Sequence, residues 1–449
     1  MRSSQRALWS GSALCGLATS LLCAGTSKAS GEETIAPLAT PTTVTEPADG
    51  AARSVLKDHL GLTGSLRAAG FSKDKSFSGE VGYGVGSLWL TASPQEVVGV
   101  RFYFDVRAQA EDLTRSSSVS LDLREAYGQR SFGGFDLKAG RQIIVWGRAD
   151  GVNPTNVWST RDFKLLAPND EDQHLGVASV QAGWSAGDYH WIAVWQPEWR
   201  YPGLPVPPLP PGVSFTNVAP SAPAQQFGGK LDHSGAEVDW SISYGHAIDR
   251  TPDIAVLPAM PPALSLGFVY RFVDTIGADA AVPIGKFGLR GEAAYARTHD
   301  SSGTDPLTKN SNVFAVVGAE RTFGGVLNIN VQYLYRRTLD FVSPSSIADP
   351  NTRFLAEQVD LISNQLAPNM HGASTRIGHK AWNETFESEI AAVIWFEKRG
   401  AALRPKVTYA FTDRLKGVLG AEIYLGPSDS VFGRLSPTSA GYGELQLGF

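Results

Sequence analysis

Apolar and polar side chains alternate along most of the chain beyond residue 59, in segments of about ten residues. In the clearest segment, 98–110, one face is apolar and the other carries Arg101, Tyr103, Asp105, Arg107 and Gln109. The pattern recurs at 237–244, 327–336 and 403–411. Because successive side chains of a β-strand point to opposite faces, the alternation predicts strands that are apolar on one side only. Ten residues is also about the length with which a tilted strand spans a membrane.

The chain contains eighteen such segments. We expect strands near 60–71, 81–92, 97–110, 118–130, 134–146, 175–185, 188–197, 225–233, 235–247, 270–283, 286–298, 312–322, 326–338, 371–382, 385–397, 402–412, 415–426 and 438–449. An even number suits a closed barrel in a bacterial outer membrane. Sixteen strands remain an alternative, because the first two segments are rich in glycine and poorly patterned.

The connections between these segments differ systematically in length. The long ones all follow odd-numbered strands, at 147–174, 198–224, 248–269, 299–311, 339–370 and 427–437. Those after even-numbered strands have one to four residues. The sequence therefore predicts an all-β fold, a transmembrane antiparallel up-and-down β-barrel with long extracellular loops and short periplasmic turns. A soluble secreted β-protein would share the alternation, so it stays open as an alternative.

The last nine residues, 441–449, also alternate, and the chain stops on Phe449. A terminal aromatic suits the membrane interface, where aromatic residues gather. We interpret Phe449 as a membrane-insertion signal read by the barrel-assembly machinery. The strand that it ends should pair with the first strand and so close the barrel.

The first 29 residues have the pattern of a secretory signal peptide, with Arg2 and Arg6 before an apolar stretch. Residues 30–58 are rich in proline, threonine and alanine and predict a flexible periplasmic lead-in. The barrel then occupies 59–449, and the predicted location is the outer membrane. Both cysteines, Cys15 and Cys23, lie in the signal peptide, so cleavage leaves no thiol for a disulfide, a metal site or a nucleophile.

Charge and motifs argue against several function classes. The chain has 39 basic and 44 acidic residues, a balance that disfavours nucleic-acid binding. No nucleophile elbow, phosphate-binding loop or zinc-protease motif occurs, and the eight histidines are scattered. We therefore expect no enzymatic activity, no catalytic residues, no cofactor and no metal.

Polar and charged side chains are densest where the fifth strand runs into the loop that follows it. Arg141, Arg148, Asp150, Asn153 and Arg161 lie here, and Asp170, Glu171 and Asp172 follow. Folded inward, such side chains could form a constriction with separated charges, as pores use to select solutes. A loop stapled by its own Arg–Asp bonds is an equal alternative. The strand pattern also slips around Arg141, which predicts a β-bulge there.

Alternation assigns further charged side chains to the interior of the barrel. Basic and acidic side chains are nearly balanced there, so the sequence predicts no strong ion preference. Arg376, Lys380, Arg404 and Lys406 fall on nearby strands and form either a basic ladder or, with Glu387 and Glu389, a salt-bridge mesh. The candidate pore-lining and constriction residues are Arg101, Asp105, Arg107, Arg124, Arg148, Asp150, Asn153, Arg161, Arg290, Arg336, Arg376, Lys380, Arg404 and Lys406.

Two long loops have patterns of their own. In 339–370, apolar residues at helical spacing over 353–366 predict a helix that starts near Asp349 and Pro350. This helix could plug the pore or pack on the outer loops. The loop 202–223 contains eight prolines and predicts a polyproline II conformation.

Three stretches resemble a known family. Leu123-Arg124-Glu125-Ala126-Tyr127 with Val145-Trp146-Gly147-Arg148-Ala149-Asp150-Gly151, and Leu403-Arg404-Pro405-Lys406 near the end, resemble an outer-membrane porin-like family of unknown function. The resemblance spans most of the chain, and it implies a barrel and kinship with alginate-export-type barrels. It implies no particular substrate.

These observations predict a porin-like channel for passive passage of small solutes, with a lumen of mixed charges narrowed by inward loops. Export of a polymer or uptake of an apolar compound is the alternative. The expected partners are outer-membrane lipids, the assembly machinery and small solutes, and the channel is expected to be a monomer or a homotrimer.

Overall fold

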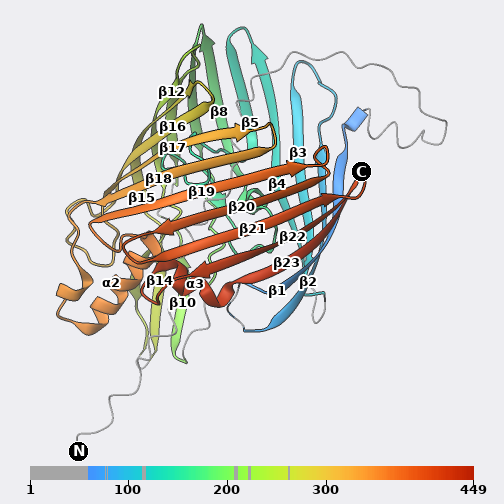
Figure 1. The fold of residues 1–449 in the computed structure, drawn as a ribbon. Helices are drawn as coiled ribbons and strands as arrows, with labels where there is room; N and C mark the ends of the chain where they lie inside the picture. Colours follow the sequence, from blue (N-terminus) through green and yellow to red (C-terminus); the bar gives the residue numbers. More distant parts are fainter. Residues whose placement is uncertain are drawn as a thin grey trace, which may run out of the picture.

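The computed structural model describes residues 59–75, 77, 79–113, 118–206, 211–220, 224–260 and 263–449. The predicted signal peptide (1–29) and lead-in (30–58) lie outside these residues. The described chain forms one large antiparallel barrel with a group of loops at one end (Figure 1). No helix among the described residues is long and apolar enough to span a membrane.

Eighteen strands build the barrel wall. They are β1 (Thr63–Lys73), β2 (Val81–Ala92), β3 (Arg101–Glu111), β4 (Ser118–Phe132), β5 (Phe135–Gln142), β8 (Val177–Ala186), β9 (Tyr189–Gln196), β11 (Gln226–His233), β12 (Asp239–Ile248), β15 (Phe272–Ile284), β16 (Phe287–Arg297), β17 (Asn312–Phe323), β18 (Leu327–Thr338), β19 (Asn369–Ala381), β20 (Phe386–Trp395), β21 (Gly400–Ala410), β22 (Leu415–Leu425) and β23 (Ala440–Gly448). Each predicted strand corresponds to one of these, so the count of eighteen is confirmed.

The last strand closes the barrel as predicted. β23 pairs with β22 on one side and with β1 on the other, from Ser65 opposite Gly448 to Phe71 opposite Tyr442. Phe449 extends this pairing, because its N–H donates to the Gly64 carbonyl at 3.0 Å and its own carbonyl accepts from Gly64 at 3.1 Å. The absent side chain of Gly64 matters here, since a Cβ would lie 2.7 Å from the Phe449 ring.

The barrel is apolar outside and polar inside. Val119, Leu121 and Leu419 face outward and are more than 65% exposed, whereas Arg107 and Glu292 face the interior and are at most 5% exposed. In water this arrangement would expose a continuous apolar surface, so it does not favour the soluble alternative. In a lipid bilayer this apolar surface contacts the hydrocarbon chains of the lipids.

Aromatic side chains form a band at each end of this outer surface. At the end with the short turns, Trp184 stacks on Phe135 at 6.0 Å and on Trp191 at 4.8 Å. At the other end, His246 stacks between Phe227 and Phe272 at 5.0 and 4.6 Å. Such bands mark the two interfaces of a membrane.

The predicted β-bulge near Arg141 is wrong. β5 keeps one register from Phe135 to Arg141 with β4 and to Gln142 with β8, and the register shift lies instead between β3 and β4, at Asp105 and Val106. Leu123 and Glu125 pair there with adjacent β3 residues, so Arg124 is the extra residue. A bulge interrupts the alternation, and Arg124 and Glu125 both bond to groups inside the barrel.

The outer loops carry a small sheet of their own. β10 (Val213–Val218), β14 (Leu264–Val269) and β13 (Asp253–Leu257) form three strands beside the barrel end (Figure 1). Residues 213–218 form the strand β10 and not the predicted polyproline II conformation, while 207–210 and 221–223 lie outside the described residues. Strand β10 contains no proline of its own, and Phe215 and Phe268 stack across β10 and β14 at 4.5 Å, which holds β10 as a strand.

The predicted helix in 339–370 is α2 (Pro350–Ser363), preceded by η3 (Pro344–Ser346). Asp349 caps it by accepting from the Thr352 N–H at 2.8 Å. Its apolar face packs on the outer-loop sheet through Leu355, Val359 and Ile362, so the helix covers the loops at the rim. A second short helix, α3 (Val431–Leu435), and η4 (Ser436–Thr438) fill the loop between β22 and β23.

One carboxyl group makes the docking of α2 sensitive to pH. Burial, with the nearby charge of Glu357, raises the pKa of Asp360 from 3.8 to about 8. The docked helix therefore prefers a protonated Asp360, and its stability falls as pH rises from about 4 through about 8. We expect hydrogen-exchange protection of α2, corrected for intrinsic rates, to fall at least about tenfold between pH 5 and 9. Asp360→Asn should abolish that dependence, and an equal fall in the variant would contradict this assignment.

Candidate functional site

The loop between β5 and β8, residues 143–176, turns into the barrel and crosses it; we call it the inward loop. It contains β6 (Thr160–Arg161), η2 (Asp170–Gln173) and β7 (His174–Leu175). Trp158 is 1% exposed and packs with Trp146 of the loop and with Val194 and Ala247 of the wall, so the loop and the wall share one apolar cluster. Side chains of the loop reach strands on opposite sides of the wall, as the contacts below describe.

Glu292 of β16 is the central anchor of this loop. Its carboxylate accepts from the N–H groups of Arg148, Ala149 and Thr155 at 3.0, 3.0 and 2.8 Å, and from the Thr155 hydroxyl at 2.8 Å. Only 3% of Glu292 is exposed. Hydrogen bonds to a buried charge contribute about 1.5–3 kcal/mol each, so this one side chain fixes the turn 148–155.

Arg148 ties the same turn to the neighbouring wall. Its guanidinium pairs with Asp279 of β15, Nε to Oδ1 at 2.8 Å, and with Asp232 of β11. Lys230 also pairs with Asp232. The loop therefore contributes a cation to a wall that supplies carboxylates.

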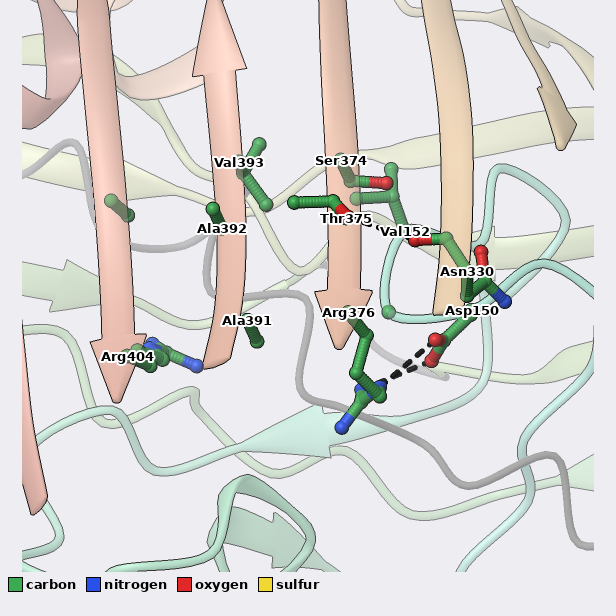
Figure 2. Close-up of a pocket in the computed structure, with 12 residues that line it drawn as sticks. Asp150, Val152, Asn330, Ser374, Thr375, Arg376, Ala391, Ala392, Val393 and Arg404 are labelled. Atoms are coloured by element: carbon green, nitrogen blue, oxygen red, sulfur yellow. Dashed lines mark hydrogen bonds and ion pairs between the residues drawn. The ribbon is translucent and has the colours of Figure 1, made fainter. Parts of the chain in front are cut away.

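The charges are reversed where the loop meets the strands β19–β21. Asp150 of the loop accepts two hydrogen bonds from Arg376 of β19, at 2.9 and 3.0 Å (Figure 2). Arg376 also donates to Glu389 of β20 at 3.1 Å, and Lys406 of β21 lies 3.6 Å from the same carboxylate. A two-point Arg–carboxylate pair of this kind is among the stronger polar contacts in proteins.

Farther along the loop, η2 meets a second set of cations. Asp170 pairs with Arg404 of β21, and Lys406 Nζ donates to the side-chain oxygen Oδ1 of Asn169 at 3.3 Å. On the opposite side Asp172 pairs with Arg67 of β1 at 2.9 Å. The segment 169–172, which we call the acidic turn, is thus held from two sides.

Two further arginines hold the backbone of the acidic turn. Arg107 donates to the Asp172 carbonyl at 3.1 Å and Arg124 to the Glu171 carbonyl at 3.2 Å. The guanidiniums of Arg67, Arg107 and Arg124 lie 4.2, 5.3 and 5.0 Å from the ring centre of Trp89. Cation–π attraction to this buried ring holds the three cations together.

Three adjoining cavities separate the inward loop from the wall. The outer cavity, about 220 Å³, is lined by the outer loops and by Asn153, Arg161 and Arg336. The middle cavity, about 30 Å³, lies between Asp150 and the β19–β21 wall and shares Gly151 and Val152 with the outer one (Figure 2). The inner cavity, about 20 Å³, shares Ala391 and Arg404 with the middle one and is bounded by Asp170.

Most of the predicted site residues converge on this loop. Those that touch it or line its cavities are Arg107, Arg124, Arg148, Asp150, Asn153, Arg161, Arg336, Arg376, Arg404 and Lys406, and Asp105 pairs with Arg124 at 2.6 Å. The loop is stapled chiefly to the wall, which differs from the predicted alternative of a loop stapled to itself. The basic ladder of β19–β21 is a salt-bridge mesh.

Three predicted residues lie elsewhere. Arg290 pairs with Glu320 of the next strand at 2.9 Å, and Lys380 with Glu384 at 3.1 Å beside a short turn. Arg101 is exposed at the start of β3. Arg336 has a further contact, because it donates to the Ser363 carbonyl at 2.9 Å and so caps the end of α2.

Sequence reasoning missed the anchoring role of Glu292 and the contributions of Arg67 and Trp89. Alternation placed Glu292 inside the barrel, but no sequence signal links it to a loop 137–144 residues away. Arg67 and Trp89 belong to the two glycine-rich strands whose pattern is weakest.

The comparisons with known proteins agree with this architecture. No family model and no curated protein matches the chain. Among solved structures, the chain is similar to OccAB2 of Acinetobacter baumannii, with 8% identity and a TM-score of 0.51 over 86% of this chain and 97% of that one. The chain folds as a closed antiparallel β-barrel like those of outer-membrane porins.

A second barrel of this type gives the same result. The outer membrane protein opdK of Pseudomonas aeruginosa is 8% identical, with a TM-score of 0.50 over 86% of this chain and 97% of that one. The resemblance to porin-like barrels is thus confirmed for the fold. The suggested kinship with alginate-export-type barrels gains no support.

The anchoring role of Glu292 predicts a specific loss. Glu292→Gln removes the charge but keeps the shape, so the four donors lose a charged acceptor. We expect the amides of 148–155 to exchange with solvent at least about tenfold faster, while the barrel strands keep their protection. Glu320→Gln, on the neighbouring strand, is the matched control. Unchanged exchange in 148–155 would contradict the anchor.

Proposed function

We propose that this barrel is an outer-membrane channel through which small polar solutes diffuse, guided between the inward loop and the β19–β21 wall. The series of three cavities carries the proposal. Each shares lining residues with the next, from the outer loops to the interior beyond Asp170. Solutes therefore have a defined route past a loop that otherwise fills the lumen.

The middle and inner cavities, about 30 and 20 Å³, are the smallest of the three and limit the size of the solutes that pass. The middle cavity has room for about two water molecules. The Asp150–Arg376 pair spans it, so larger solutes pass only when that pair parts. We call the middle cavity with its Asp150–Arg376 pair the neck. Small solutes would diffuse through this neck when the pair parts.

The lining chemistry favours polar solutes over the alternatives. The neck presents Arg376, Arg404, Asn330 and Ser374 beside small apolar groups. An apolar compound would have to pass the charged groups of Asp150, Arg376 and Arg404, and a polymer in transit would need the anchored loop to leave the lumen. The Asp150–Arg376 pair presents a negative and a positive group side by side to a polar solute, as the linings of selective pores do.

The neck makes a direct prediction for conductance. Arg376→Ala removes the partner of Asp150 and shortens the side chain that spans the middle cavity. In planar bilayers we expect single-channel conductance to rise about twofold or more, because one of the two small cavities on the route widens.

Lys380→Ala is the matched control for this variant. Lys380 is a basic residue on the same strand, but it pairs with Glu384 and Glu387 near the short turns. Its conductance should equal that of the unmodified chain. Equal conductance in Arg376→Ala and the unmodified chain would place the route elsewhere.

A further inference from the structure

We propose that the acidic turn, 169–172, is a salt-sensitive latch: it occupies a cationic cradle on the wall as an internal anion, and ions in the lumen release it and widen the inner cavity. This inference rests on the proposed channel function. It concerns a contact separate from the Asp150–Arg376 neck.

The cradle consists of five cationic side chains on four strands. Arg67, Arg107 and Arg124 approach from one side and Arg404 and Lys406 from the other. The acidic turn supplies two carboxylates, two backbone carbonyls and one side-chain amide. It thus makes the contacts that a small anionic solute would make with the same wall.

The cradle has supports that do not depend on the turn. Arg124 pairs with Asp105 at 2.6 Å and Arg107 with Asp122 at 3.4 Å. Trp89 lies under the guanidiniums and donates to the Ser87 hydroxyl at 2.9 Å. Because these contacts remain when the turn leaves, the cradle can exchange the turn for other anions.

The turn itself is weakly held by its own backbone. The helix η2 has four residues, and its N-cap Asn169 makes no side-chain capping bond. Only the two pairs of β6 and β7, Thr160 with Leu175 and Arg161 with His174, join its flanks as strands. Leu166 packs on Phe71 and Val85 and keeps the preceding segment in place, so the moving part is confined to the turn.

Release of the turn would open the inner end of the route. Asp170 and Pro168 both line the inner cavity, and the Tyr442 hydroxyl donates to the Pro168 carbonyl at a long 3.5 Å. With the turn displaced, this cavity joins the space in front of β1–β4. The latch therefore acts below the neck and in series with it.

Salt acts on this contact chiefly through competition, because Asp170 and Asp172 are only 5% and 9% exposed and buried charge pairs are screened weakly. Guanidinium groups bind anions directly, so added chloride competes with the two carboxylates for the cradle. The fraction of open latch should therefore rise with salt concentration.

The test is single-channel conductance of the full-length barrel in potassium chloride at 0.1 M and 1 M, divided by the conductivity of the solution. For the unmodified chain we expect this ratio to rise with salt. In the double variant Asp170→Asn/Asp172→Asn, the ratio of closed latch to open latch should fall at least about tenfold. The conductance of this variant divided by the solution conductivity should then already be high at 0.1 M and should not change at 1 M potassium chloride.

The control removes two acidic side chains from exposed loop positions, Asp340→Asn/Glu357→Gln. This variant should keep the salt dependence of the unmodified chain. Folding of each variant is checked by heat-modifiable migration on a detergent gel.

A flat ratio in the unmodified chain would overturn the latch, as would unchanged conductance in a folded Asp170→Asn/Asp172→Asn variant. If that variant does not fold, the salt dependence of the unmodified chain decides alone. A conducting barrel with a flat ratio leaves the channel function standing and removes only the latch. A barrel that does not conduct at either salt concentration overturns both.

Discussion

The inward loop can cross the barrel because the charges it brings meet opposite charges on the wall. Removing a charge from water is costly unless a partner compensates it. Three residues of the loop form ion pairs with the wall: Arg148 with Asp279, Asp150 with Arg376, and Asp170 with Arg404. These pairs face different parts of the wall, so together they fix the height and the orientation of the loop. The three cavities are what remains of the lumen once these pairs have formed.

The sequence predicts the wall of this barrel well, because each strand reports its own environment. A side chain facing lipid is apolar and its neighbour facing the lumen is polar, so alternation over about ten residues suffices. The closing pair of β23 and β1 follows from the same rule, and the capping of α2 by Asp349 follows from local chemistry. The sequence did not predict the bulge at Arg124. Arg124 and Glu125 are two inward side chains in succession, and such a pair interrupts the alternation without showing which residue is the extra one.

The site is predicted less completely, because its contacts join distant parts of the chain. Asp150 and Arg376 are 226 residues apart, and Arg404 and Asp170 are 234 apart. Residue type indicated that these side chains belong inside, yet no spacing rule pairs them. Glu292 illustrates the limit: one glutamate among several inward ones receives four hydrogen bonds, and only the folded loop singles it out.

The central claim is that solutes pass between the inward loop and the β19–β21 wall. Both cysteines of the chain lie at positions 15 and 23, before the barrel, so a single cysteine in the wall can be labelled without a background from the barrel itself. Ala391 lines both the middle and the inner cavity, whereas the adjacent Ile390 faces outward and is 40% exposed. A charged thiol reagent should block the current through Ala391→Cys and leave Ile390→Cys unaffected. Undiminished current through a labelled Ala391→Cys channel would contradict this route.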